Sequence, residues 1–268
     1  MPAPVVPVAP AVPGGPGGPI RNLLPRRRQV LAGSFAAGLL AVSLAGCGSA
    51  QDRATAPTTE RTSATPRALP ATEATTLSQL PARLGADGTT VVVGDPDARH
   101  AVQVYADFRC PYCATAEGAT GELLASAAAR GELRIEYTLA SFLDGRLGGE
   151  GSVKAANAAR AALEAGRFPE YHAALFANQP TEEGRDGFTD AFLLDVASGV
   201  PGLRSDAFDQ AVQGLAYRDW VGAARQAFER SGVGSTPTVV LDGQRITDGS
   251  RYDRAAFARV LERAGIPT

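Results

Sequence analysis

The heptapeptide Asp107-Phe108-Arg109-Cys110-Pro111-Tyr112-Cys113 joins a segment of alternating apolar residues to an alanine-rich segment. The alternation over residues 100–106 predicts a strand that ends near Asp107, and residues 113–130 predict a helix. Cys110 is therefore expected near the helix N-cap. The free backbone N–H groups and the positive end of the helix dipole stabilise a thiolate there. The pKa of Cys110 should thus lie below the value of about 8.5 for a free cysteine.

The residues after Cys110 fit the same interpretation. Pro111 suits the first helical turn, where its missing N–H is not needed and its fixed φ matches the helix. Cys113 comes three residues after Cys110, so it lies on the same helical face, within reach of a disulfide. We predict a redox-active Cys110–Cys113 pair, with Cys110 as the attacking sulfur and Cys113 as the resolving one.

Three other interpretations of the pair remain open at this point. A structural disulfide would close so short a loop that it would add little stability. A zinc site would have to use His100 and His172, the only histidines, in a chain with no second Cys-x-x-Cys and no spaced His pair. The cysteines could also be buried and have no role.

The composition indicates one medium-sized globular domain with additional segments. The chain has 268 residues, a net charge of −2, and 20% charged and 44% hydrophobic residues. This charge is too close to neutral to suggest binding to nucleic acid. Gly and Pro concentrate in the first fifty residues, where no core could form.

The N-terminal part has the features of an export signal. Arg26, Arg27 and Arg28 precede an uncharged stretch rich in Ala, Gly, Leu and Val that runs to Gly46. The residues around Arg27 and Arg28 also resemble a twin-arginine motif. Leu44-Ala45-Gly46-Cys47 resembles the lipobox of bacterial lipoproteins. Residues 1–47 are therefore predicted to be an n-region and signal peptide, with Cys47 as the lipidated first residue of the mature chain.

Cys47 would anchor the protein to the outer face of the cell membrane. The cysteine count agrees, since removing Cys47 from the three leaves one pair. The alternative is an uncleaved N-terminal transmembrane helix, and either outcome places the C-terminal part outside the cytoplasm, where disulfide chemistry operates. Residues 48–80 are rich in Thr, Ala and Pro and are expected to be a disordered linker, spanning about 30 Å.

Residues 81–268 are expected to form a single domain. Strands are predicted over 89–93, 100–106 and 133–139, and helical periodicity dominates from about 152 to 231. Residues 238–246 contain Asp242-Gly243, a two-residue hairpin signal, and Asp253 can cap a last helix. His172 lies on an apolar helical face and is interpreted as a core residue. The predicted order is β-α-β, a helical block, then β-β-α.

This order resembles the thioredoxin fold with a helical insertion, as in the DsbA-like family of extracytoplasmic thiol-disulfide oxidoreductases. The similarity covers about residues 89–265. Besides the Cys-Pro-Tyr-Cys heptapeptide, two motifs carry it: Phe168-Pro169-Glu170-Tyr171-His172-x-x-Leu175-Phe176 and Gly234-Ser235-Thr236-Pro237-Thr238.

The resemblance implies a site and a function. It implies a cis bond between Thr236 and Pro237 facing the active-site sulfurs, with Phe108, Pro111 and Tyr112 as further active-site residues. It implies an α/β thioredoxin-like enzyme that needs no cofactor or metal and acts on cysteine-containing exported proteins. A membrane redox partner, either a quinone-linked reoxidase or a reductant, would return the Cys110–Cys113 pair to its starting redox state after each exchange.

The direction of electron flow is the open question. The best-known oxidases of the family have histidine at the position of Tyr112, and tyrosine supplies no positive charge to a thiolate. The disulfide should then be less oxidising, with a potential between roughly −120 and −270 mV. A dithiol oxidase is our prediction; a disulfide reductase or isomerase kept reduced by a membrane donor, and a redox-inactive peptide-binding module, are the alternatives.

Overall fold

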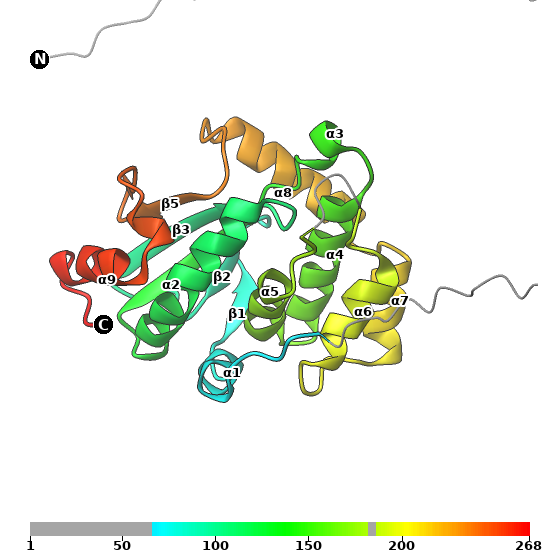
Figure 1. Cartoon of the computed structure of the whole chain (residues 1–268), viewed down its shortest axis with the longest axis horizontal. Coiled ribbons are helices and arrows are strands. Elements are labelled where there is room, and N and C mark those ends of the chain that lie inside the picture. The colour runs from blue at the N-terminus through cyan, green and yellow to red at the C-terminus, as the bar shows by residue number, and fades with distance from the viewer. Residues whose placement is uncertain (1–65, 182–185) are drawn as a thin grey trace, which may run out of the picture. The chain divides into compact units, whose positions relative to one another are not determined.

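The structure, a computed structural model, describes residues 66–181 and 186–268. In these residues the chain forms a six-stranded sheet with helices packed against it (Figure 1). The strands are β1 (Ala82–Leu84), β2 (Val91–Val93), β3 (His100–Ala106), β4 (Leu133–Leu139), β5 (Thr238–Leu241) and β6 (Gln244–Arg245). The helices are α1 (Ala71–Ser78), α2 (Pro111–Ala129), α3 (Asp144–Leu147), α4 (Gly151–Glu164), α5 (Phe168–Ala177), α6 (Asp190–Ser198), α7 (Asp206–Gln213), α8 (Arg218–Arg230), the short 3-10 helix η1 (Ser250–Tyr252) and α9 (Arg254–Arg263).

The strand order of the sheet is β1-β2-β4-β3-β5-β6. Strands β3 and β4 are parallel, with Val102 opposite Ile135, because α2 carries the chain back between them. The other neighbouring strands are antiparallel. The β5–β6 turn has positive φ at both Asp242 and Gly243, as the Asp-Gly signal predicts for a tight hairpin. The predicted thioredoxin-like α/β fold is confirmed.

The core lies between the sheet and helix α2, which contacts α1, α5, α9 and β4. Apolar residues of β4 alternate with more exposed ones at one end of the strand, and Leu133 and Ile135 are almost completely buried. Figure 1 shows α2 crossing in front of the sheet, with α9 beside it. The N-terminus of α2 is thereby held at the carboxyl end of β3, where the heptapeptide with the two cysteines begins.

The insertion between β4 and β5 is helical, as predicted for residues 152–231. Helices α4 to α8 bury the apolar stripes that their periodicity indicates, including Leu193, Phe208 and Phe228. The completely buried Asn157 of α4 donates to the carbonyl of Ala211 at 3.0 Å and accepts from the N–H of Tyr217 at 2.8 Å. This side chain joins α4 to α7 and to the start of α8.

The predicted linker over residues 48–80 is wrong in its last part. Residues 71–78 form helix α1, which contacts α2 and α5, and Leu77 and Leu80 are buried in the core. The polar composition conceals this docking, because two leucines three residues apart are enough to attach one short helix to an existing core. Strand β1 was also not expected; it has only three residues and takes its conformation from pairing with β2.

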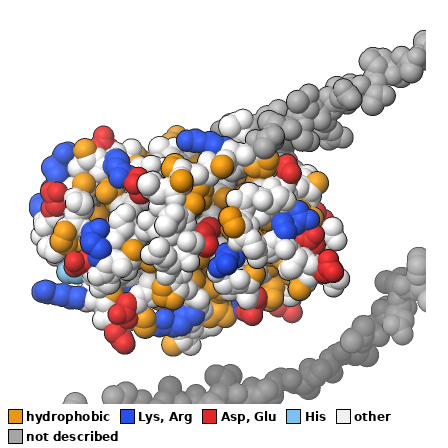
Figure 2. Space-filling view, turned by 90° about the horizontal axis from the view of Figure 1, so that it is seen from below, with side chains coloured by type: hydrophobic (Ala, Val, Ile, Leu, Met, Phe, Trp, Pro, Cys, Tyr) orange, Lys and Arg blue, Asp and Glu red, His pale blue; other side chains and the backbone are white. Residues whose placement is uncertain are grey.

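The described surface carries both signs of charge. Lys and Arg side chains alternate with Asp and Glu over the face shown in Figure 2, in keeping with the near-neutral net charge. Among residues 66–181 and 186–268, no helix has the length and apolar character needed to cross a membrane. The predicted signal peptide, the lipidation site Cys47 and most of the linker lie outside these residues.

Candidate functional site

The site is built on the first turn of α2. Cys110 is the N-cap residue, with an extended backbone (φ −82°, ψ 114°), and Pro111 occupies the first helical turn. The N–H groups of Cys113 and Ala114 donate to the Cys110 carbonyl oxygen at 3.0 and 3.3 Å. The sulfur of Cys110 therefore lies at the positive end of a 19-residue helix, where an anion is favoured.

Both thiols are shielded from solvent. Cys110 is 6% exposed and Cys113 is 2% exposed. The Cys110 thiol lies 3.6 Å from the carbonyl oxygen of Thr236, to which it can donate, although 126 residues separate the two in sequence. The peptide bond between Thr236 and Pro237 is cis. The predicted residues of the heptapeptide and of the 236–237 loop thus come together around the sulfur.

The two thiols have opposite pKa shifts. The pKa of Cys110 is lowered to about 6, chiefly because the Cys113 thiol donates a hydrogen bond to its sulfur, with further hydrogen bonds from the Thr236 side chain and the Cys113 N–H. Burial raises the pKa of Cys113, and the neighbouring Cys110 raises it further. One thiol is thus a thiolate near neutral pH while the other keeps its proton, which is the asymmetry that an attacking and a resolving sulfur require.

Phe108 and Tyr112 have different surroundings. Phe108 is 1% exposed and packs against Phe176 and His172 of α5, with ring centroids 4.8 and 5.6 Å away. It therefore joins the heptapeptide to the helical insertion. Tyr112 is 66% exposed, and its ring centroid lies 6.3 Å from that of Tyr252. Tyr112 is available at the surface beside the sulfurs.

The two histidines have partners other than the cysteines. The Nδ1 of His100 lies 2.7 Å from a carboxylate oxygen of Asp242, within hydrogen-bond distance, and this contact joins the start of β3 to the β5–β6 turn. His172 is 2% exposed among aromatic rings, and its Nδ1 lies 3.5 Å from a carboxylate oxygen of Glu117. In the described part of the chain, no group of three metal-ligating side chains occurs. His172 is a core residue, as interpreted from the sequence.

Asp107 was not singled out from the sequence, although it supports the site. Its buried carboxylate accepts from the N–H of Arg109 at 2.9 Å, the N–H of Leu143 at 3.0 Å and the hydroxyl of Ser152 at 2.7 Å. Burial raises its pKa. The Arg109 guanidinium is paired with Asp144 at 2.7 Å. The sequence holds no signal for the contacts with Leu143 and Ser152, which lie 36 and 45 residues away from Asp107.

A second residue absent from the sequence predictions is Gln179, which follows α5. Its side-chain nitrogen donates to the carbonyl oxygens of Phe108 and Cys110, at 2.6 and 2.9 Å. Nothing in the sequence marks this glutamine, because it lies 69 residues from Cys110 and outside every motif.

Cys110 opens into a cavity of about 640 Å³. Its walls include the apolar side chains of Phe142, Leu143, Leu147, Pro180 and Phe188, together with Arg146. A cavity of this size and character beside a nucleophile can hold part of an extended polypeptide.

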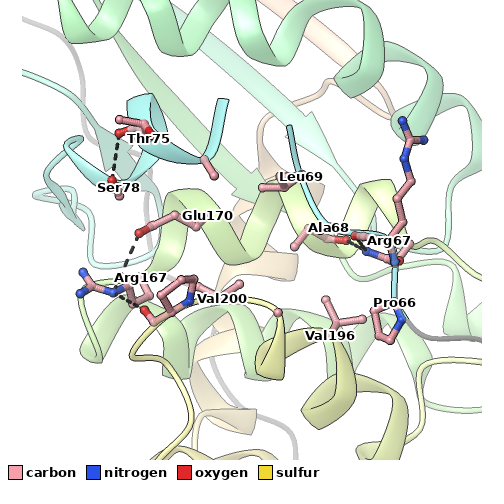
Figure 3. A pocket seen from close by; sticks show the side chains of 15 residues that line it. Pro66, Arg67, Ala68, Leu69, Thr75, Ser78, Arg167, Glu170, Val196 and Val200 are labelled. Atoms are coloured by element: carbon pink, nitrogen blue, oxygen red, sulfur yellow. Dashed lines mark hydrogen bonds and ion pairs between the residues drawn. The ribbon is translucent and has the colours of Figure 1, made fainter. Parts of the chain in front are cut away.

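A second cavity, of about 370 Å³, contains neither cysteine. It lies under residues 66–69, between α1, α5 and the loop after α6 (Figure 3). Figure 3 shows Glu170 and Arg167 on one side, with Leu69 and Val196 on others. The Glu170 side chain is buried, and its Oε2 has no hydrogen-bond partner among the described residues.

Comparison with known proteins agrees with this geometry. A family model described as thioredoxin matches residues 86–261, which include both cysteines and Pro237. The chain belongs to the thioredoxin family. A solved structure of MdbA, a thiol-disulfide oxidoreductase from Corynebacterium diphtheriae, is 25% identical, with a TM-score of 0.53 over 63% of this chain and 89% of that one. The predicted resemblance to the DsbA-like thiol-disulfide oxidoreductases is confirmed.

Two further proteins show the extent of the likeness. DsbA from Mycobacterium tuberculosis has the same fold, with 23% identity and a TM-score of 0.53 over 69% of this chain and 92% of that one. The Na(+)/H(+) antiporter NhaA 3 of Salinispora tropica is 35% identical over 161 residues, which are 58% of this chain and 22% of that protein. The chain spans about a quarter of the length of the curated relatives it matches.

Proposed function

We propose that this enzyme is an extracytoplasmic dithiol oxidase that transfers the Cys110–Cys113 disulfide to cysteine-containing exported proteins. The observation that carries the proposal is the opposite shift of the two thiol pKa values. A thiolate that is stable at neutral pH favours the reduced enzyme, and an enzyme whose reduced form is favoured is an oxidant.

The exchange begins with the disulfide form. A substrate thiolate attacks the Cys110 sulfur, the Cys110–Cys113 bond breaks, and Cys113 leaves with the electron pair and takes up a proton. A second substrate thiolate then attacks the substrate sulfur of the mixed disulfide, and Cys110 leaves as its stable thiolate. Two electrons pass from the two substrate thiols to the enzyme. The lowered pKa of Cys110 makes it the better leaving group in this last step.

The surroundings of Cys110 support a polypeptide substrate. The 640 Å³ cavity is mainly apolar, and the Thr236 carbonyl lies beside the sulfur. An unfolded exported chain presents apolar side chains and free backbone groups on either side of a cysteine. We assign the binding of such a segment to this cavity. Thr236 and Pro237 would lie beside the sulfur, and Pro111 and Tyr112 at the rim of the cavity. Phe108 would support the heptapeptide from the core.

The proposed location rests on the N-terminal sequence. Export by the signal within residues 1–47, followed by lipidation of Cys47, would hold the enzyme at the outer face of the cell membrane. A quinone-linked membrane protein would then reoxidise the reduced pair. Growth of cells with labelled fatty acid tests the anchor, since Cys47→Ala should abolish labelling and release the protein from the membrane.

The decisive experiment is the redox equilibrium of the Cys110–Cys113 pair with glutathione, followed by thiol trapping. A pKa near 6 lies between about 3.5 for the strongest oxidants and about 7 for thioredoxin, so we expect a potential between roughly −120 and −270 mV. The wild-type enzyme should also oxidise a reduced unfolded protein, and Cys110→Ser should not. A value at or below −270 mV would favour the reductase, and no exchange at all would favour a redox-inactive peptide-binding module.

A further inference from the structure

Gln179 connects the helical insertion to the turn that carries the nucleophile. The residue follows α5, and its backbone N–H donates to the carbonyl of Phe176 at 3.2 Å. Its side-chain amide nitrogen donates to two carbonyl oxygens, those of Phe108 and Cys110, at 2.6 and 2.9 Å. An amide nitrogen has two hydrogens, so these contacts use its whole donor capacity. We propose that Gln179 is a positioning residue for thiol–disulfide exchange, which holds Cys110 in the N-cap geometry that its thiolate requires.

The Cys110 carbonyl oxygen is the group through which the hydrogen bond from Gln179 affects the Cys110 sulfur. The carbonyl oxygen accepts from three donors: the N–H of Cys113, the N–H of Ala114 and the Gln179 side chain. The same Cys113 N–H, which donates to this carbonyl at 3.0 Å, also contributes to the lowered pKa of the Cys110 thiol. The carbonyl and the sulfur therefore compete for one N–H group. By donating to the carbonyl, Gln179 leaves more of the Cys113 N–H available to the thiolate.

The second contact of Gln179 restricts the backbone before Cys110. Among the described side chains, Gln179 is the one that donates to the Phe108 carbonyl, and Arg109 between the two carbonyls is held separately by Asp144 at 2.7 Å and by the Gly148 carbonyl at 2.6 Å. Gln179 and Arg109 thus anchor the heptapeptide to the insertion, in addition to the contacts of Asp107 with Leu143 and Ser152. Without Gln179, the carbonyls of Phe108 and Cys110 would lose a donor, and the peptide planes around Cys110 could rotate away from the N-cap conformation.

Asn178, the preceding residue, offers a matched control. It has the same side-chain chemistry one methylene shorter, and it also makes two contacts with the backbone of a distant segment: it accepts from the N–H of Arg67 at 2.5 Å and donates to the Arg67 carbonyl at 2.9 Å. These contacts hold residues 66–69 over the second cavity (Figure 3). Asn178 therefore fastens the N-terminal segment, whereas Gln179 fastens the active-site turn.

The test compares Gln179→Met with Asn178→Ala in the full chain, with Cys47→Ala in every variant so that only the active-site thiols titrate. Methionine keeps the length of glutamine but donates no hydrogen bond. Thiolate absorbance against pH should show the Cys110 ionisation constant reduced at least about threefold in Gln179→Met, a pKa rise of about half a unit. The glutathione equilibrium should shift by a similar factor toward the disulfide. Asn178→Ala should leave both values unchanged.

Other outcomes separate this inference from the proposed function, on which it rests. If Gln179→Met lowers the melting temperature while the Cys110 titration stays as in the wild type, the role of Gln179 is only structural and the inference is wrong. If the wild-type protein itself exchanges no disulfide, the proposed function fails instead. Gln179→Glu is the second variant, should methionine prevent folding; its carboxylate cannot donate and should raise the Cys110 pKa further, and an unchanged pKa there would also overturn the inference.

Discussion

The hydrogen bond between the two thiols makes Cys113 a controlling group for the acidity of Cys110, beyond its part in the disulfide. Replacement by alanine removes the donor that contributes most to the lowered Cys110 pKa. A hydrogen bond to a charged group is worth roughly 1.5–3 kcal/mol, and one pKa unit corresponds to about 1.4 kcal/mol. The Cys110 pKa in Cys113→Ala should therefore rise by about one to two units, from about 6 to between roughly 7 and 8.

The consequence at neutral pH is large enough to measure directly. At pH 7, a pKa of about 6 leaves roughly nine-tenths of Cys110 as thiolate, and the predicted rise reduces this to between about one-half and one-tenth. Thiolate absorbance and the pH profile of iodoacetamide alkylation, in chains that also carry Cys47→Ala, report this fraction. Cys113→Ser is the matched control, because a serine hydroxyl can still donate to the thiolate. Equal Cys110 pKa values in the alanine and serine variants would refute the argument.

Two more predictions concern stability. In the reduced protein, Cys110 has a lower pKa in the fold than in the unfolded chain, so its stabilising effect is complete above about pH 8.5 and is lost as the pH falls through about 6. Denaturant unfolding at pH 5 and pH 8 measures the unfolding free energy of the reduced and the oxidised forms. The value for the reduced form should rise relative to that for the oxidised form at pH 8. The same difference between the two forms at both pH values would contradict this prediction. Asp107→Ala leaves the donors on Arg109, Leu143 and Ser152 without their acceptor, and should reduce the unfolding free energy by about 3 kcal/mol. Ser152→Ala, which removes one donor, should cost distinctly less.

Local sequence was sufficient where a residue and its neighbours in the chain decide the structure together. The alternation of β4 and the Asp242-Gly243 turn each predicted the observed element. The N-cap placement of Cys110 also followed from local pattern, because a strand, a Cys-Pro step and an alanine-rich run leave one place for the helix to begin. Local pattern failed for α1, whose composition is that of a linker and whose order comes from burying Leu77 and Leu80.

The sequence by itself determined the two sulfurs, their three-residue spacing, the helix that carries them and, through resemblance, the proline loop that faces them. The tertiary structure decided what surrounds them. Gln179 and Ser152 reach the heptapeptide from an insertion that follows β4, and their side chains are not distinguished from those of any other glutamine or serine until the fold is known. Hydrogen bonds depend on distance in space and not on separation along the chain. For this reason the nucleophile could be read from the sequence, whereas the groups that hold it in place required the structure.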